Sequence, residues 1–124
     1  MVDKTKTVLV IEDDESVRNL LVRALSELYT TYQAADATAA MKLLESIKAP
    51  SLILCDVMMP GMSGTELVRK LKKLEPYQNV PVIFLTAKSG PLDVIEGINA
   101  GARSYVTKPF QMRDLLEKIA KAMR

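Results

Sequence analysis

Three short apolar runs without polar alternation constrain the fold of this 124-residue chain more than any other feature. They occupy residues 8–11, 52–55 and 80–85, and they are rich in β-branched side chains. A strand with one face in water alternates apolar and polar residues, whereas a continuous apolar run is typical of a strand covered on both faces. The runs therefore predict the central strands of a parallel sheet that has helices on both sides.

Segments with the apolar spacing of helices follow each predicted strand. In the first helix, Leu20 falls on the apolar side and Val22 on the outer side. Two further strands are predicted at residues 29–34 and 103–106, and the low apolar content of the first suits an edge strand. The helix starts are marked, in chain order, by Asp14 or Glu15, by Asp36, by the capping-box pair Ser63 and Glu66, and by Gly90 with Pro91.

The alternation of strand and helix, repeated five times, predicts an α/β fold. We expect a flavodoxin-like, doubly wound (βα)5 arrangement with a five-stranded parallel sheet, formed by residues 1–124 as a single domain. Five strands favour the strand order 2-1-3-4-5, because the dinucleotide-binding fold needs six. In that order the weak strand at residues 29–34 lies at an edge of the sheet, which fits its composition.

Composition excludes several classes of function. Lys and Arg number 17 and Asp and Glu 15, so the net charge of +2 gives no reason to expect direct binding to nucleic acid. The absence of histidine excludes His-based metal sites, Ser–His nucleophile pairs and a phosphohistidine donor within this chain. A single cysteine fits a reducing, cytoplasmic compartment. No apolar run approaches the roughly 20 residues of a membrane span, so no membrane association is expected.

Polar residues follow four of the predicted strands at their carboxyl ends. In doubly wound sheets, ligands bind outside these ends, at the point where the strand order reverses. Three carboxylates, one hydroxyl and one ammonium should therefore meet at one rim, contributed by Glu12, Asp13, Asp56, Thr86 and Lys108. Two like charges about 4 Å apart repel by roughly 4 kcal/mol at an effective dielectric constant near 20. A bound Mg²⁺ together with the lysine would relieve that repulsion and accommodate phosphate oxygens.

Asp56 is the candidate phosphoryl acceptor, since it stands alone at its strand end, whereas Glu12 and Asp13 are adjacent, as metal ligands can be. Carboxylates that form aspartyl phosphates are established nucleophiles. A glycine-rich phosphate loop is missing after the first strand, where four consecutive acids stand instead. These acids would repel a nucleotide pyrophosphate, which argues against dinucleotide and flavin binding.

Four sequence blocks together resemble a response-regulator receiver domain. They are residues 10–14 (Val-Ile-Glu-Asp-Asp), 54–64 (Leu-Cys-Asp-Val-Met-Met-Pro-Gly-Met-Ser-Gly), 85–87 (Leu-Thr-Ala) and 108–110 (Lys-Pro-Phe). They match the motifs of that family in order and spacing, and the resemblance covers essentially the whole chain. The 2-1-3-4-5 strand order is also the one found in the chemotaxis member of the family.

The resemblance implies a role for each site residue. Asp56 corresponds to the phosphoacceptor. Asp13, Asp56 and the backbone carbonyl of Met58 correspond to ligands of Mg²⁺, with Mn²⁺ as an alternative, and Glu12 to an acid that acts directly or through water. Lys108 would pair with the phosphoryl group.

Two further features are implied by the same resemblance. The bond between Lys108 and Pro109 is expected to be cis. Thr86 and Tyr105 correspond to a switch pair, in which the hydroxyl moves toward the phosphate and the ring changes rotamer.

The implied function is a phosphorylation-activated switch of a two-component phosphorelay. A sensor histidine kinase or a histidine phosphotransfer protein would donate the phosphoryl group. The fourth helix, fifth strand and fifth helix, residues 91–120, would then act on a downstream target or on an output domain of the same protein, and a homodimer formed on phosphorylation is compatible with this scheme. No enzymatic activity is expected beyond Mg²⁺-dependent self-phosphorylation and slow autodephosphorylation.

Two other functions stay open at this point. One is a receiver-like adaptor that binds partners without phosphorylation. The other is a Mg²⁺-dependent phosphohydrolase with an aspartyl nucleophile, although such enzymes usually carry a D-x-D pattern after the first strand, and Asp56 is followed by Val57 and Met58. The outward position predicted for Val22 also makes it a candidate contact for a kinase.

Overall fold

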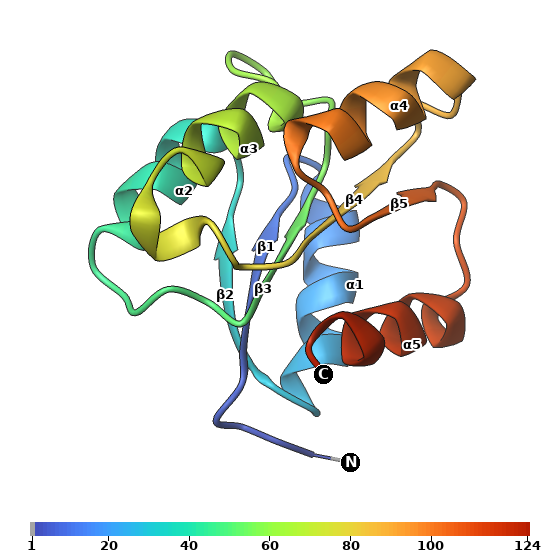
Figure 1. The fold of residues 1–124 in the computed structure, drawn as a ribbon. Helices are drawn as coiled ribbons and strands as arrows, with labels where there is room; N and C mark the ends of the chain where they lie inside the picture. Colours follow the sequence, from blue (N-terminus) through green and yellow to red (C-terminus); the bar gives the residue numbers. More distant parts are fainter. Residues whose placement is uncertain (1) are drawn as a thin grey trace.

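The computed structural model describes residues 2–124, which form a three-layered α/β sandwich (Figure 1). The strands are β1 (Thr7–Ile11), β2 (Thr30–Ala34), β3 (Leu52–Cys55), β4 (Val82–Thr86) and β5 (Ser104–Thr107). The helices are α1 (Glu15–Ser26), α2 (Ala37–Leu44), α3 (Gly64–Lys72), α4 (Pro91–Ala100) and α5 (Met112–Ala122), with a short 3₁₀ helix at Glu75–Tyr77. The alternation predicted from the sequence is confirmed, and the 3₁₀ helix is an addition to it.

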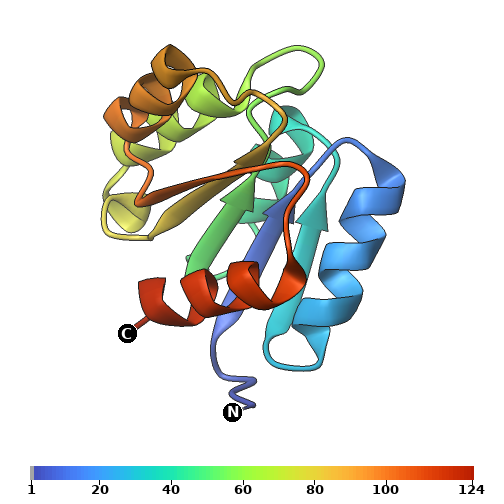
Figure 2. The same ribbon diagram turned by 90° about the vertical axis from the view of Figure 1, so that its right-hand side faces the viewer.

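All neighbouring strands pair in parallel, in the order β2-β1-β3-β4-β5. This is the predicted 2-1-3-4-5 order, with β2 at one edge. Helices α1 and α5 cover one face of the sheet, and α2, α3 and α4 lie on the other (Figures 1 and 2). The reversal of strand order therefore lies between β1 and β3, where the chain enters helices on opposite faces.

The central strands are buried on both faces because alternate side chains enter different cores. In β1, Leu9 and Ile11 pack with α2 and α3, whereas Val8 and Val10 pack with α1 and α5. All four side chains are at most 1% exposed. This two-sided burial is the reason that the run shows no polar alternation.

The predicted orientation of α1 is wrong at two positions. Leu20 is 53% exposed, while Val22 packs partly buried against the α1–α5 core. The buried stripe of this helix is centred on Leu21 and Leu25, and one residue of an α-helix rotates the side chain by about 100°. Leu20 is thereby turned to solvent, so it replaces Val22 as the exposed apolar side chain of α1.

The helix starts carry the caps that the sequence indicates. Asp14 accepts from the backbone N–H of Val17, and Asp36 accepts from that of Ala39. Ser63 and Glu66 form the predicted capping box of α3. Among the described residues, 2–124, no helix is both long enough and apolar enough to cross a bilayer.

Candidate functional site

The predicted site residues meet at the carboxyl rim of the sheet. Glu12 and Asp13 follow β1 directly, Asp56 follows β3, Thr86 is the last residue of β4, and Lys108 follows β5. Backbone pairing continues past the strands on this rim: the N–H of Glu12 donates to Ala34 and that of Asp56 to Ile11. The backbone hydrogen bonds between neighbouring strands thus align the residues that carry these polar side chains along the same edge of the sheet.

The Lys108 ammonium group lies between two buried carboxylates. Its Nζ is 2.8 Å from Oε1 of Glu12 and 2.9 Å from Oδ2 of Asp56. Glu12 and Asp56 are only 2% and 5% exposed. The Lys108–Pro109 bond is cis, as expected, and the backbone N–H of Lys108 donates to the carbonyl of Thr86.

Further hydrogen bonds orient the side chains of Asp56 and Glu12. Oδ1 of Asp56 accepts from the N–H of Met58 at 2.9 Å, so both oxygens of this carboxylate have a partner. Oε2 of Glu12 accepts from the N–H of Asp14 at 3.1 Å, and Arg18 donates to the Glu12 carbonyl. The two buried carboxylates are therefore held in fixed orientations.

Negative charge exceeds positive charge in this cluster. Burial raises the pKa of Glu12, and this effect outweighs its hydrogen bond from Lys108. Burial opposes the charge of Lys108, but its hydrogen bonds to Glu12 and Asp56 raise its pKa overall. Lys108 bonds two of the three carboxylates, and Asp13 stands exposed beside the buried pair. The three acids therefore carry more formal negative charge than Lys108 offsets.

The oxygens of this cluster suit a hard metal ion. One carboxylate oxygen each from Glu12, Asp13 and Asp56 lie within 4.8 Å of one another. Hard divalent ions such as Mg²⁺ take oxygen ligands from one or two carboxylates and retain water. The exposed side of Asp13 leaves room for that water, so the donor set fits Mg²⁺.

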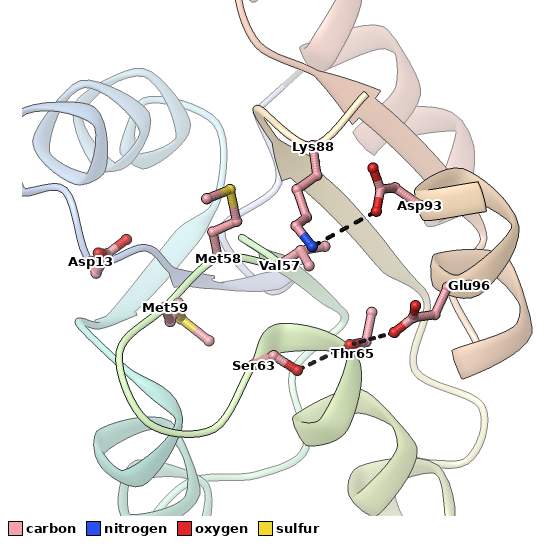
Figure 3. A pocket seen from close by; sticks show the side chains of 9 residues that line it. All are labelled: Asp13, Val57, Met58, Met59, Ser63, Thr65, Lys88, Asp93 and Glu96. Atoms are coloured by element: carbon pink, nitrogen blue, oxygen red, sulfur yellow. Dashed lines mark hydrogen bonds and ion pairs between the residues drawn. The ribbon is translucent and has the colours of Figure 1, made fainter. Parts of the chain in front are cut away.

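A cleft of about 470 Å³ opens beside these acids, between the β3–α3 loop and α4 (Figure 3). Met58 lines it and is 50% exposed, and Lys88 crosses toward Asp93 at 3.8 Å. Its other lining residues are Asp13, Val57, Met59, Ser63, Thr65 and Glu96. The cleft reaches the rim at Asp13.

The two predicted switch residues are joined through the backbone of Lys88. Thr86 is fully buried, and its Oγ1 accepts from the Lys88 N–H at 3.3 Å. The Tyr105 hydroxyl donates to the Lys88 carbonyl at 2.6 Å. Burial is also the main cause that raises the pKa of Tyr105. This link leaves no signal in the sequence, because it uses backbone atoms, which any residue at position 88 except proline would supply.

A family model described as the response regulator receiver domain matches residues 8–120, nearly the whole chain. The chain belongs to this family. Receiver domains bind Mg²⁺ at an acidic pocket and act as signalling switches rather than as true enzymes, and the cluster of Glu12, Asp13 and Asp56 fits that description.

Individual relatives agree with this assignment. The chain is 38% identical over 120 residues to the phosphate regulon transcriptional regulatory protein PhoB of Pseudomonas aeruginosa, covering 96% of this chain and 52% of PhoB. It is 34% identical over 118 residues to the DNA-binding response regulator MtrA of Mycobacterium tuberculosis, covering 94% and 50%. The chain spans about half the length of these curated relatives.

Among solved structures, the receiver domain is similar to the chemotaxis protein CheY4 of Vibrio cholerae. The TM-score is 0.88 at 29% identity, and the match covers 94% of this chain and 98% of CheY4. This likeness confirms the flavodoxin-like fold predicted from the sequence.

Gly64 brings the start of α3 of this receiver domain against the Asp56 backbone. A Cβ atom on Gly64 would lie 2.1 Å from the carbonyl oxygen of Asp56. The N–H of Gly64 also donates to the Val57 carbonyl at 2.9 Å. The sequence indicates the cap formed by Ser63 and Glu66 but not the role of Gly64, because a close approach of two backbones leaves no periodic signal.

We expect Gly64→Ala to lower the free energy of unfolding by about 2–3 kcal/mol, because overpacking against a rigid backbone costs that much. Urea denaturation measures the loss. Gly61→Ala is the matched control: Gly61 has a φ of +77° and open space around it, so it should cost only about 1–2 kcal/mol of backbone strain. A cost for Gly64→Ala below that of the control would contradict the close approach.

Proposed function

We propose that this receiver domain is a phosphorylation-activated switch that accepts a phosphoryl group on Asp56 from a phosphohistidine. The observation that carries the proposal is that Asp56 contacts the Lys108 ammonium and shares an oxygen cluster with Glu12 and Asp13. Its donor would be a sensor histidine kinase or a histidine phosphotransfer protein, which supplies the imidazole that this chain lacks.

The transfer step needs few groups from this chain. A carboxylate oxygen of Asp56 forms a bond to phosphorus while the phosphorus–nitrogen bond of the donor breaks. The electron pair of the broken bond stays on the imidazole nitrogen, which takes up a proton. Asp56 is held for this attack by the Met58 N–H and by Lys108. Positioning and charge stabilisation are the main contributions that a protein makes to phosphoryl transfer.

Mg²⁺, or Mn²⁺ as an alternative, is the proposed cofactor, held by Asp13, Asp56 and the Met58 carbonyl, with Glu12 acting directly or through water. When bound, the ion supplies positive charge that offsets the phosphoryl oxygens. Lys108 already contacts Asp56 at 2.9 Å, so it pairs with the new charge with little movement. The chain itself thus contributes one cation and a set of hard oxygen ligands.

Phosphorylation turns the single charge of Asp56 into nearly two, and the response of the domain is a shift between conformations. Thr86 donates its hydroxyl to a phosphoryl oxygen, and its link through Lys88 to Tyr105 carries the change to α4 and β5. Moving an equilibrium from 1:99 to 99:1 takes about 5.5 kcal/mol. Charge-assisted hydrogen bonds from Thr86 and Lys108 are of the strong kind that can supply much of it.

The output surface in this proposal is residues 91–120, which act on a downstream target or on an output domain. Its α4 portion exposes Leu92 at 80% and Ile95 at 54%. Apolar side chains on an outer helix face are suited to burial against another protein surface. A homodimer formed on phosphorylation would use the same face.

The direct test is to incubate the protein with a small phosphodonor such as acetyl phosphate, once with Mg²⁺ and once with EDTA. The incorporated phosphoryl groups are counted from the intact mass of the protein. We expect one phosphoryl group per chain with Mg²⁺ and none with EDTA. A phosphorylation-independent adaptor would incorporate none in either buffer. Steady release of phosphate from varied phosphate esters would instead favour a phosphohydrolase.

We expect Met58→Asn to speed loss of the phosphoryl group by about tenfold, the effect of one well-placed hydrogen bond on a barrier. Met58 is half exposed beside the acceptor and has no polar group to orient an attacking water. The rate is measured by following the phosphorylated mass after removal of the donor. Met58→Leu, an apolar change of similar volume, should leave it unchanged. An equal or slower rate for Met58→Asn would contradict this role.

A further inference from the structure

Gly97, in the middle of α4, has no room for a side chain. A Cβ atom there would lie 2.7 Å from both Cδ2 and Cε2 of Tyr105 and 3.2 Å from Cδ2 of Phe84. Separations below 3.0 Å are essentially never made by real Cβ atoms. The Tyr105 ring therefore occupies the volume that any other residue would fill at this position of α4, which lies over β4 and β5 in both ribbon views (Figures 1 and 2).

The need for glycine at this position is one of space and not of backbone conformation. Among the described residues, the glycines with positive φ are Gly61 and Gly101, so Gly97 has an ordinary helical backbone that alanine adopts well. Glycine in a helix interior weakens the helix relative to alanine. Glycine at position 97 is unfavourable for the helix, but it leaves the space that the Tyr105 ring occupies.

The Tyr105 ring, packed against Gly97, is linked to Thr86 by two hydrogen bonds through Lys88. Its hydroxyl donates to the Lys88 carbonyl at 2.6 Å, and the Lys88 N–H donates to Oγ1 of Thr86 at 3.3 Å. The ring also packs against Phe84, with centroids 6.0 Å apart and planes tilted by 59°. The position of the ring against α4 therefore sets where its hydroxyl and its Phe84 contact lie.

We propose that Gly97 is a positioning residue, whose missing side chain seats the Tyr105 ring against α4 and so places the Tyr105 hydroxyl on the Lys88 carbonyl. The functional consequence of this inference rests on the proposed function. Because the Lys88 N–H donates to Thr86, the packing of Tyr105 against Gly97 connects the phosphorylation site to the α4 surface. Gly97 touches no carboxylate of the site and acts only through Tyr105.

The test is Gly97→Ala, examined by ring resonances of ¹³C-labelled tyrosine without any phosphodonor. Tyr105→Phe assigns the Tyr105 signal. We expect the signal in Gly97→Ala to move to the position of a solvent-exposed tyrosine, and the unfolding equilibrium constant to rise about tenfold, for the loss of a hydrogen bond and its packing. Asn99→Ala, an exposed change on the same helix, should leave the Tyr105 signal in place.

A double-mutant cycle separates the seat from general helix packing. In a Tyr105→Ala background the two shortest contacts of the methyl group are gone and the next, Cδ2 of Phe84, is at 3.2 Å, so Gly97→Ala should be neutral or should lower the unfolding equilibrium constant several-fold through helix propensity. The inference is overturned if the methyl group destabilises both backgrounds equally, or if the Tyr105 signal stays in place in Gly97→Ala. Failure of the wild-type chain to incorporate phosphoryl would contradict the proposed function alone, since these measurements use no phosphodonor.

Discussion

Asp56→Asn should abolish incorporation of phosphoryl from acetyl phosphate in the presence of Mg²⁺, by more than about a thousandfold in rate. A carboxamide is not a nucleophile toward phosphorus, and loss of the attacking group removes the whole covalent step. The measurement is intact mass over time at fixed donor concentration. The fold should survive the change, because the amide oxygen can still accept from Met58 and Lys108 keeps its contact with Glu12.

Asp14→Asn is the matched control for this result. Asp14 is an exposed acid on the same rim, and it caps α1 by accepting from Val17. Asparagine caps helices about as well as aspartate, so folding and incorporation should match the wild type. Undiminished incorporation by Asp56→Asn would show that another acid is the acceptor, with Asp13 and Glu12 as the next to replace.

Lys108→Met should lower the free energy of unfolding by about 3–5 kcal/mol in Mg²⁺-free buffer at neutral pH. Glu12 and Asp56 are nearly inaccessible to water, and Lys108 is the cation that bonds both. Removing one partner of a buried ion pair leaves an uncompensated buried charge, which costs that much. Methionine keeps the apolar length of the side chain, so urea denaturation reports chiefly the lost charge.

Added Mg²⁺ should restore more stability to Lys108→Met than to the wild type. In the variant three carboxylates remain without an ammonium, so the ion binds the folded state more tightly, and tighter binding raises stability at a given concentration. Lys118→Met makes the same change on the exposed face of α5 and should shift stability by less than about 0.5 kcal/mol. Equal losses in the two variants would contradict the pairing.

The pH dependence of the Lys108→Met variant follows from the raised pKa of Glu12. A group whose folded-state pKa is raised contributes stability that is present below its unfolded pKa and is lost as pH rises through the folded value. Without Mg²⁺, the stability of the variant should approach that of the wild type as pH falls below the ordinary pKa of glutamate, and the gap should widen as pH rises and Glu12 ionises. In the wild type the raised pKa of Lys108 keeps the counter-charge through neutral and mildly alkaline pH.

Much of the fold follows from local patterns in the chain. Continuous apolar runs indicate that β1 and β3 are buried on both faces. The starts of α1, α2 and α3 are marked by side chains that hydrogen-bond to the backbone of the first turn. Five alternations then leave one common strand order, and parallel strands bring their carboxyl ends to one rim. The approach of residues 12, 56 and 108 could be predicted because it follows from this topology.

Orientations within α1 and α4 could not be predicted in the same way. Periodicity places Leu20 on the apolar side of α1, whereas the packing against the sheet turns it to solvent and covers Val22. In α4 the large apolar residue Ile95 is 54% exposed, whereas the buried residues of the helix are the small ones, Gly97 and Ala100. A pattern shows that a helix has an apolar side but not how it is rotated against its neighbour.

Residue types and their spacing along the chain are therefore enough to predict the parallel sheet, its strand order and the set of polar groups at the rim. The tertiary structure alone decided that Lys108 bonds both Glu12 and Asp56, that Lys88 joins Thr86 to Tyr105 through its backbone, and that Gly64 and Gly97 leave room for close neighbours. The physical reason is that such contacts depend on short distances between segments remote in the chain, and on backbone atoms that all residues share.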